Sequence, residues 1–377
     1  MSIIQLLGLT PVKPFTSSKA VPLPCADPAL LMGLELEIEG IAADPSEFYV
    51  PGMGGVADNS LRDNEYGRGW EFITRPATFS VAAHTLSQFF AKAKLSPERN
   101  YSERCSIHVH ANVQDLTPEQ LKSVCILYQV FERLFYSYAG EDRDKNIFCV
   151  PWSETTLTHT LIDTLLDANL KGFRNWQKYT GLNLIPVQTQ GTIEFRHLPG
   201  TCDLSRIFDW MNLIGSLFVT ARNTPFEEIK SFIVNVNTTS EYKHLVHRVF
   251  GEWARVLDMP YMDTQLEEGV LDVKYMLLSA DKPKVPTKLR FNDWAALAPA
   301  ERAHVQVVEE QVNVAGNWNI IADHALLDDA ADVLHQRIRD AQAQEAIRAQ
   351  ALAQGVFADP PNGGRNPFAV PAARHRR

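Results

Sequence analysis

Residues 33–40, Gly-Leu-Glu-Leu-Glu-Ile-Glu-Gly, alternate strictly between apolar and acidic side chains and are closed by glycine at both ends. Successive side chains of an extended chain point to opposite faces, so one face is apolar and the other carries three carboxylates. Like charges at this spacing repel, so the acidic row must face water or meet positive charge. By itself, such a row is typical of a solvated sheet face. The pattern predicts a strand and leaves the role of its glutamates open.

Three further stretches combine an apolar face with a chemically reactive one. Residues 105–112 alternate apolar side chains with Ser106, His108, His110 and Asn112. Residues 192–197 place Glu194 and Arg196 on one face, and residues 70–76 place Glu71 opposite Trp70 and Phe72, although an ion pair with Arg75 is an alternative role for Glu71. If these strands share one sheet, its polar face gathers carboxylates, imidazoles and a guanidinium.

Helical patterns between these strands supply the cover for the apolar face. Apolar residues recur at helical spacing over residues 80–93, 121–138 and 207–217. Thr117 and Gln120 form a capping box around Pro118, which marks a helix start. A further amphipathic helix is expected at 157–170. Residues 51–69, rich in Gly, Asp and Asn, are expected to form a long loop, and loops of this length are functional or mobile. This order of elements fits a sheet with helices on one face.

Bulk properties restrict the class of protein. The 377 residues are 45% hydrophobic and 21% charged, as in a soluble globular protein. The net charge of -9 argues against general binding of nucleic acids or anionic membranes, which needs a basic footprint. Five scattered cysteines without a Cys-x-x-Cys pair indicate reduced thiols. Without an apolar stretch long enough to span a bilayer or a recognisable leader, we expect a cytoplasmic protein.

The domain organisation follows from composition and helical pattern. Five prolines within residues 1–30 predict an extended N-terminal segment. Residues 31–221 contain the strands and covering helices and are expected to be the catalytic core. Residues 222–354 predict a mostly helical extension, including helices at 299–314 and 322–354, and residues 355–377 predict a disordered tail.

The predicted polar face suits metal and nucleotide chemistry. Oxygen and imidazole ligands together suit Mg²⁺ or Mn²⁺, and two or three such ions would leave positions open for the phosphate oxygens of ATP. Arg196 shares a face with Glu194 and is placed to stabilise a phosphoryl group in transfer. The two histidines would also suit zinc, but the many carboxylates favour harder ions. The candidate metal ligands are Glu35, Glu37, Glu71, His108 and Glu194.

The ordered set of motifs resembles a known family. The motifs are Gly-x-Glu-x-Glu at 33–37, Asp-x-Ser-Leu at 58–61, Trp-Glu-Phe-Ile-Thr at 70–74, His-x-His at 108–110, Arg-x-x-Asn at 143–146, Lys-Tyr-x-x-Leu-Asn at 178–183 and Thr-Ile-Glu-Phe-Arg at 192–196. Together they resemble the putative amidoligase family of bacteria and phages, which is related to glutamine synthetase and glutamate-cysteine ligase. The resemblance covers residues 31–221, and its specificity lies in the whole set.

The resemblance implies a role for each matched residue. Glu35, Glu37, Glu71 and His108 would be metal ligands, with His110 nearer the nucleotide. Glu194 would hold the metal under the γ-phosphate, and Arg196 would contact the phosphoryl group or a substrate carboxylate, which makes these two the catalytic pair. Substrate or anion binding is expected at Asp58, Ser60, Arg143 and Lys178. Asn59 stands where the family usually has glycine, and residues 224–377 have no counterpart.

These observations lead to one expected activity and three rivals. We expect an α+β fold with a glutamine-synthetase-like open, mostly antiparallel sheet, helices on one face and a C-terminal helical extension. The expected activity is ATP- and Mg²⁺-dependent joining of a small-molecule or peptide carboxylate to an amine, in a chain compatible with a homo-oligomer. The alternatives are a related phosphoryl transferase, a non-catalytic phage or host scaffold, and a zinc hydrolase.

Overall fold

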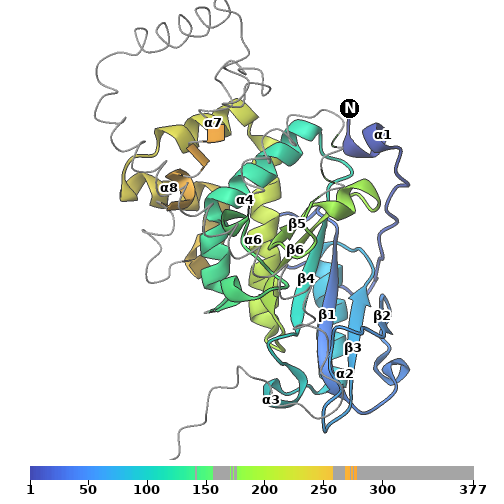
Figure 1. Cartoon of the computed structure of the whole chain (residues 1–377). Helices are drawn as coiled ribbons and strands as arrows, with labels where there is room; N and C mark the ends of the chain where they lie inside the picture. Colours follow the sequence, from blue (N-terminus) through green and yellow to red (C-terminus); the bar gives the residue numbers. More distant parts are fainter. Residues whose placement is uncertain are drawn as a thin grey trace, which may run out of the picture. The chain divides into compact units, whose positions relative to one another are not determined.

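A six-stranded antiparallel sheet in the order β2-β3-β1-β4-β6-β5 organises the described part of the chain (Figure 1). The computed structural model describes residues 1–140, 142–155, 170, 173, 176–257 and 268–277, without 272 and 275. The strands are β1 (Met32–Ile41), β2 (Met53–Val56), β3 (Arg68–Thr74), β4 (Ser106–Asn112), β5 (Leu182–Asn183) and β6 (Thr192–Pro199).

Helices and short 3-10 turns connect and cover these strands. The described helices are α1 (Ile3–Leu7), α2 (Phe79–Ala93), α3 (Pro97–Asn100), α4 (Pro118–Ala139), α6 (Leu204–Asn223), α7 (Phe226–Asn235) and α8 (Thr239–Phe250). The described turns are η1 (Pro45–Phe48), η2 (Arg143–Lys145), η3 (Trp152–Glu154), η5 (Ile185–Gln188) and η6 (Gly251–Leu257). None of these helices combines the length and hydropathy that crossing a membrane requires.

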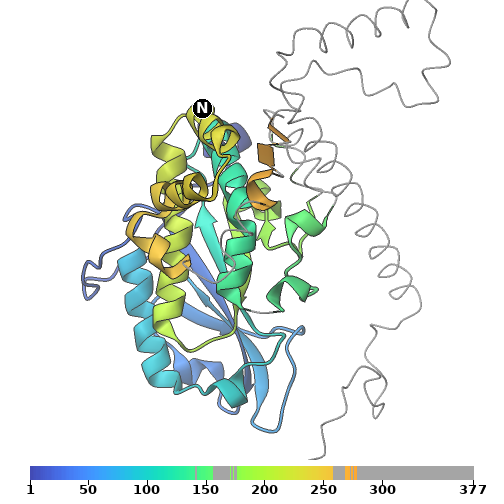
Figure 2. The same cartoon turned by 90° about the vertical axis from the view of Figure 1, so that its left-hand side faces the viewer.

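The main core lies between the sheet and helices α2, α4 and α6 (Figures 1 and 2). The apolar faces of β1, β4 and β6 are fully buried there, represented by Leu34, Val109 and Phe195. Helix α4 begins as its sequence predicts, because Thr117 Oγ1 accepts from Gln120 N at 3.2 Å and Gln120 Oε1 accepts from Thr117 N at 2.9 Å. The prediction of an open antiparallel α+β sheet with helices on one face is confirmed.

The register of the sheet aligns the polar faces of neighbouring strands. Glu35 on β1 is the partner of His108 on β4, and Glu37 on β1 is the partner of Glu71 on β3. On the other side of β4, His110 is the partner of Glu194 on β6. Directly opposed residues have neighbouring side chains on the same face. The side chains predicted to form one site therefore lie across adjacent strands.

The structure differs from the sequence predictions in two connecting regions. The predicted loop at 51–69 contains strand β2 and the first residues of β3. The N-terminal segment, predicted to be extended, begins with helix α1, and Ile3 is completely buried in the core. Ile3 N donates to Leu116 O at 2.8 Å, which ties this helix to the turn before α4. The first residues of the chain are therefore part of the folded core.

The chain beyond residue 221 continues the same compact unit over its described part. Helix α7 contacts α4, α8 contacts α6, and Ile233 and Leu245 are buried in these contacts. The described part of the region predicted as a helical extension contains α7, α8 and the 3-10 turn η6. The helices predicted at 299–314 and 322–354 and the tail at 355–377 lie outside the described residues, as does the helix at 157–170 apart from residue 170.

Candidate active site

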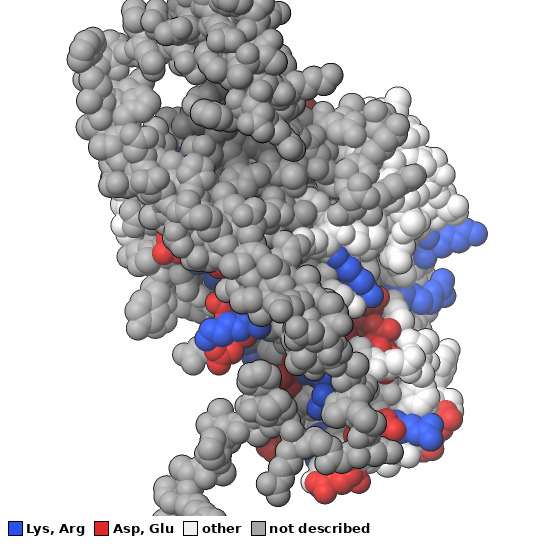
Figure 3. All heavy atoms as spheres, in the orientation of Figure 1, with Lys and Arg blue, Asp and Glu red and all other residues white. Residues whose placement is uncertain are grey.

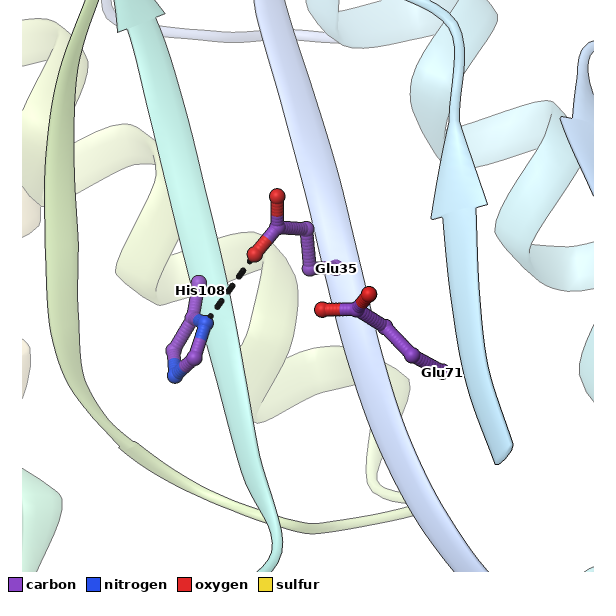
Figure 4. Close-up of side chains that lie close together, drawn as sticks. All are labelled: Glu35, Glu71 and His108. Carbon is purple, nitrogen blue, oxygen red and sulfur yellow. Dashed lines mark hydrogen bonds and ion pairs between the residues drawn. The ribbon is translucent and has the colours of Figure 1, made fainter. Parts of the chain in front are cut away.

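Glu35 is the centre of a cluster that joins strands β1, β3, β4 and β6. Its Oε2 lies 3.1 Å from His108 Nδ1, and its Oε1 lies 3.1 Å from His110 Nε2. His108 Nδ1 also lies 3.3 Å from Glu194 Oε1. Figure 4 shows Glu35, Glu71 and His108, each from a different strand, pointing toward one another. The structure thus brings together the side chains of the three separate motifs.

Three overlapping groups of potential metal ligands occur among the described residues. Within each group, the nitrogen or oxygen atoms lie within 4.8 Å of one another. Neighbouring groups share Glu71 or Glu35, so the groups form a continuous row across the sheet. Their members are Glu37, Asp58 and Glu71, then Glu35, Glu71 and His108, then Glu35, His110 and Glu194.

The electrostatics of this row fit divalent cations. Burial, followed by repulsion from Glu35, Asp58 and Glu37, raises the pKa of Glu71 to about 8. Burial also acts to raise the pKa of Glu35, but its hydrogen bonds to His108 and His110 outweigh this effect and lower that pKa. His110 Nε2 is buried and lies 3.1 Å from Glu35 Oε1. Several carboxylates and imidazoles converging in this way are the donor set that Mg²⁺ or Mn²⁺ uses.

Ser106 fixes two of the candidate ligands. Its backbone N–H donates to Glu37 Oε2 at 2.8 Å, and its hydroxyl contacts the same oxygen and lies 2.8 Å from His108 Nε2. Partners of this kind orient metal ligands and set the tautomer of the imidazole. The sequence analysis did not select Ser106 as a site residue. Its signal was its position on the polar face of the strand that carries both histidines.

Arg196 and Glu194 form an ion pair at the β6 end of the row. Arg196 Nε donates to Phe148 O at 3.1 Å, and the guanidinium lies 5.8 Å from the centre of the Tyr179 ring. Burial acts to raise the pKa of Glu194, but the charges of His108 and Arg196 outweigh it and lower the pKa. The second carboxylate oxygen accepts from Asn183 Nδ2 at 2.7 Å. Asn183 belongs to the Lys-Tyr-x-x-Leu-Asn motif but was not predicted as a site residue.

The Asp58 loop reaches the opposite end of the row. Asp58 accepts two hydrogen bonds from Ser60, one from its backbone N–H at 2.7 Å and one from its hydroxyl at 2.8 Å. Arg104 Nη1 donates to Ser60 O at 2.8 Å, which ties the loop to the segment before β4. Asp58 lies with Glu37 and Glu71, so it is a candidate metal ligand in addition to its predicted role in substrate binding.

Two predicted anion-binding residues lie outside the ligand row. Arg143 is buried and donates to the backbone oxygens of His197 at 2.7 Å and Arg196 at 2.8 Å, so it supports strand β6. Lys178 is exposed, with its ammonium 5.5 Å from the Tyr179 ring centre. Anion binding by these two side chains stays a prediction. Arg75, the alternative partner for Glu71, lies 5.5 Å from the Phe15 ring centre.

Residues 55–217 match the family described as "Putative amidoligase enzyme". This segment belongs to the amidoligase family. The match contains Asp58, Glu71, His108, Glu194 and Arg196. Strand β1, which carries Glu35 and Glu37, lies before the matched segment. The family predicted from the ordered motifs is therefore confirmed over this segment, and the match favours a ligase. No curated protein matches the chain.

The visible charges around the amidoligase segment are mixed in sign. On the face shown in Figure 3, acidic and basic side chains of the described residues lie interspersed. Within that described surface, no broad basic area gathers on this face. The cations with a clear structural role are instead single arginines, such as Arg104 at the Asp58 loop and Arg196 at β6.

Proposed function

We propose that this protein is an ATP- and Mg²⁺-dependent carboxylate-amine ligase that forms an amide or isopeptide bond through an acyl phosphate. The observation that carries the proposal is the row of three ligand groups, which ends at the paired Glu194 and Arg196. The amidoligase family of residues 55–217 supports the same class of reaction. The proposal includes a glutamine-synthetase-like arrangement, in which helices cover one face of the open sheet and the metal and ATP bind on the other face.

Each part of the row has a role in the proposed reaction. Mg²⁺ or Mn²⁺, held by the ligand groups, would supply neutralisation of the phosphate charge. Glu35 orients both imidazoles, and Ser106 orients His108 and Glu37. Arg196 is held by Glu194 and Phe148 O, so its guanidinium is oriented before a substrate binds. Such preorganisation stabilises charge that develops on a transferring phosphoryl group.

The proposed reaction has two steps that balance. A carboxylate oxygen of the substrate attacks the γ-phosphorus of ATP, and the bond to the bridging oxygen of ADP breaks. An amine then attacks the acyl carbon, loses a proton, and expels inorganic phosphate. The protein contributes by aligning the partners and shielding the acyl phosphate from water. All five cysteines are free thiols, which suits the cytoplasmic location that we propose.

Glu37→Gln and Glu194→Gln test the metal assignment. Each variant keeps the side chain's size and removes its charge, so we expect Mg²⁺-dependent ATP turnover with pooled amino acids and peptides to fall by about 100-fold or more. Glu227→Gln, at an exposed position on α7, is the matched control and should retain full turnover. Unchanged turnover in both site variants would contradict the assignment.

The mass of the product separates the ligase from its rivals. A ligase product contains the amine, whereas a phosphoryl transferase leaves a phosphorylated substrate. A non-catalytic scaffold predicts no Mg²⁺-dependent binding of ATP in calorimetry. Mn²⁺ titration of the wild type and of Glu35→Gln complements these assays, because Glu35 belongs to two of the three ligand groups.

A further inference from the structure

Glu132 is a buried carboxylate on the covered side of the sheet, outside the ligand row. It lies on α4, and its side chain accepts three hydrogen bonds. Tyr128 OH donates to Oε1 at 2.6 Å, Trp152 N donates to the same oxygen at 2.6 Å, and Ser153 N donates to Oε2 at 3.0 Å. The two backbone donors open the 3-10 turn η3, so Glu132 caps this turn from a different element.

Tyr136, one helical turn further along α4, holds the same segment. Its hydroxyl donates to Cys149 O at 3.0 Å. Cys149 directly follows Phe148, whose carbonyl oxygen accepts from Arg196 Nε. Residues 148–153 are therefore attached to α4 at two points, Glu132 and Tyr136, and to the candidate catalytic arginine at a third.

The same segment forms an isolated parallel bridge with Thr180, just before β5. Val150 N donates to Tyr179 O at 2.7 Å, and Gly181 N donates to Val150 O at 2.9 Å. Tyr179 lies against the Arg196 guanidinium, and the rings of Phe148 and Tyr179 pack edge to face with centres 5.6 Å apart. Both groups that contact Arg196 on this side thus depend on the position of residues 148–153.

We propose that Glu132 and Tyr136 are positioning residues that act through residues 148–153 to hold the Arg196 guanidinium in its working orientation. The expected effect of these residues on catalysis rests on the proposed ligase function. Its structural part, the link from α4 to Arg196, depends only on the contacts described above. The two residues touch no reacting group and work from the opposite face of the sheet.

A carboxylate at position 132 is chemically specific. Two adjacent backbone N–H groups need two acceptors, and a carboxylate presents two oxygens without a donor. Glutamine offers one oxygen, and its amide group would face the second N–H donor-to-donor. A buried N–H without a partner costs about 1 to 3 kcal/mol, so the segment would move to regain a hydrogen bond. Glu132→Gln therefore changes the shape of the side chain little but removes one of its two hydrogen bonds to the backbone of residues 152–153.

The first readout is hydrogen exchange at the Arg196 Nε–H, measured by nuclear magnetic resonance on the full chain and assigned with Arg196→Lys. In the wild type, the hydrogen bond to Phe148 O protects this proton. We expect Glu132→Gln and Tyr136→Phe each to speed its exchange by about tenfold or more. The matched control is Ser123→Ala, a buried α4 hydroxyl that donates within its own helix to Glu119 O, and it should leave the rate unchanged.

The second readout is a double-mutant cycle on ligase turnover. We expect Glu132→Gln to lower kcat by about 10- to 100-fold, with the KM for ATP within about threefold of the wild type, because orientation and not binding is lost. In an Arg196→Lys background, the same change should produce little further loss. Equal losses in both backgrounds would overturn the proposal.

Unchanged Nε–H exchange in a folded Glu132→Gln or Tyr136→Phe protein would also overturn the proposal. If Glu132→Gln fails to fold, Tyr136→Phe decides the question, since it removes a single oxygen. A wild-type protein without ligase turnover would contradict the proposed function alone. The exchange measurement would still test the link between α4 and Arg196.

Discussion

Some side chains of the candidate site could be predicted from the sequence, and others could not. Glu35 and His108 were predicted as ligands from strand alternation, and the structure places their side chains 3.1 Å apart. The contribution of Asp58 to the ligand row was not predicted, because it depends on where a loop returns to the sheet. Ser106 and Asn183 were not predicted as site residues because both side chains are uncharged. Each nevertheless donates a hydrogen bond to a candidate ligand, Ser106 to Glu37 and Asn183 to Glu194.

His197 provides a pH-dependent test of the core behind the site. Burial, followed by the nearby charge of Arg143, lowers the pKa of His197 well below its usual value. Below pH 6.5 the unfolded chain binds a proton at this histidine and the folded chain does not, so stability falls as the pH falls. Between pH 7.5 and 5.5, we expect the wild type to lose about 1.4 kcal/mol more unfolding free energy than His197→Gln.

Denaturant unfolding at several pH values measures this difference. His244→Gln, at an exposed position on α8, is the matched control and should follow the wild-type curve. Parallel curves for the wild type and His197→Gln would show that the imidazole gains its proton in the folded protein too.

At the scale of elements, local patterns predicted the strands and covering helices more accurately than the connections. Strand β1 and helix α4 begin within a residue or two of their predicted starts, because alternation and capping are properties of neighbouring residues. Strand β2 was missed inside a glycine-rich stretch that shows no alternation. Strand β2 is extended because it pairs with β3, and its own sequence shows no strand pattern.

Gly67 tests how tightly the Asp58 loop is fixed to β1. It has a φ of +149°, and a Cβ there would lie 2.2 Å from the backbone carbon of Ile41. Since this backbone lies in the sheet and cannot move aside, we expect Gly67→Ala to lower the free energy of unfolding by about 2 kcal/mol or more. We also expect weaker Mn²⁺ binding, because the loop would carry Asp58 away from Glu37.

Thermal unfolding and Mn²⁺ titration check both effects. The control is Gly54→Ala on β2, where an added Cβ meets no heavy atom within 4 Å. It should change stability by no more than about 0.5 kcal/mol. Equal behaviour of the two variants would mean that the loop is not held where the structure places it.

At the scale of the whole molecule, the described chain forms a larger unit than the predicted core. The N-terminal helix and helices α7 and α8 pack on the same core as the amidoligase segment. Arg222 on α6 links these segments, because it forms ion pairs with Asp27 before β1 and with Asp115 before α4. Segments without a strong local pattern can thus be integral to the fold.

Ile3→Ala tests whether the first residues stabilise the core. The side chain is completely buried, so we expect a loss of about 2 to 4 kcal/mol of unfolding free energy. Val21→Ala is the matched control in the same N-terminal segment, where the side chain is 69% exposed, and it should change stability by less than about 0.5 kcal/mol. A denaturant titration in which both variants unfold like the wild type would contradict the integration of α1.

The sequence by itself determined which face of each strand is apolar, where the main helices begin, and which residue types could bind a metal. These features follow from periodicity and capping, which depend on residues close together in the chain. Tertiary structure alone decided that His110 opposes Glu194, that Asp58 returns to Glu37, and that Glu132 holds Trp152. Strand order and register arise from packing between distant segments, so no local pattern contains them.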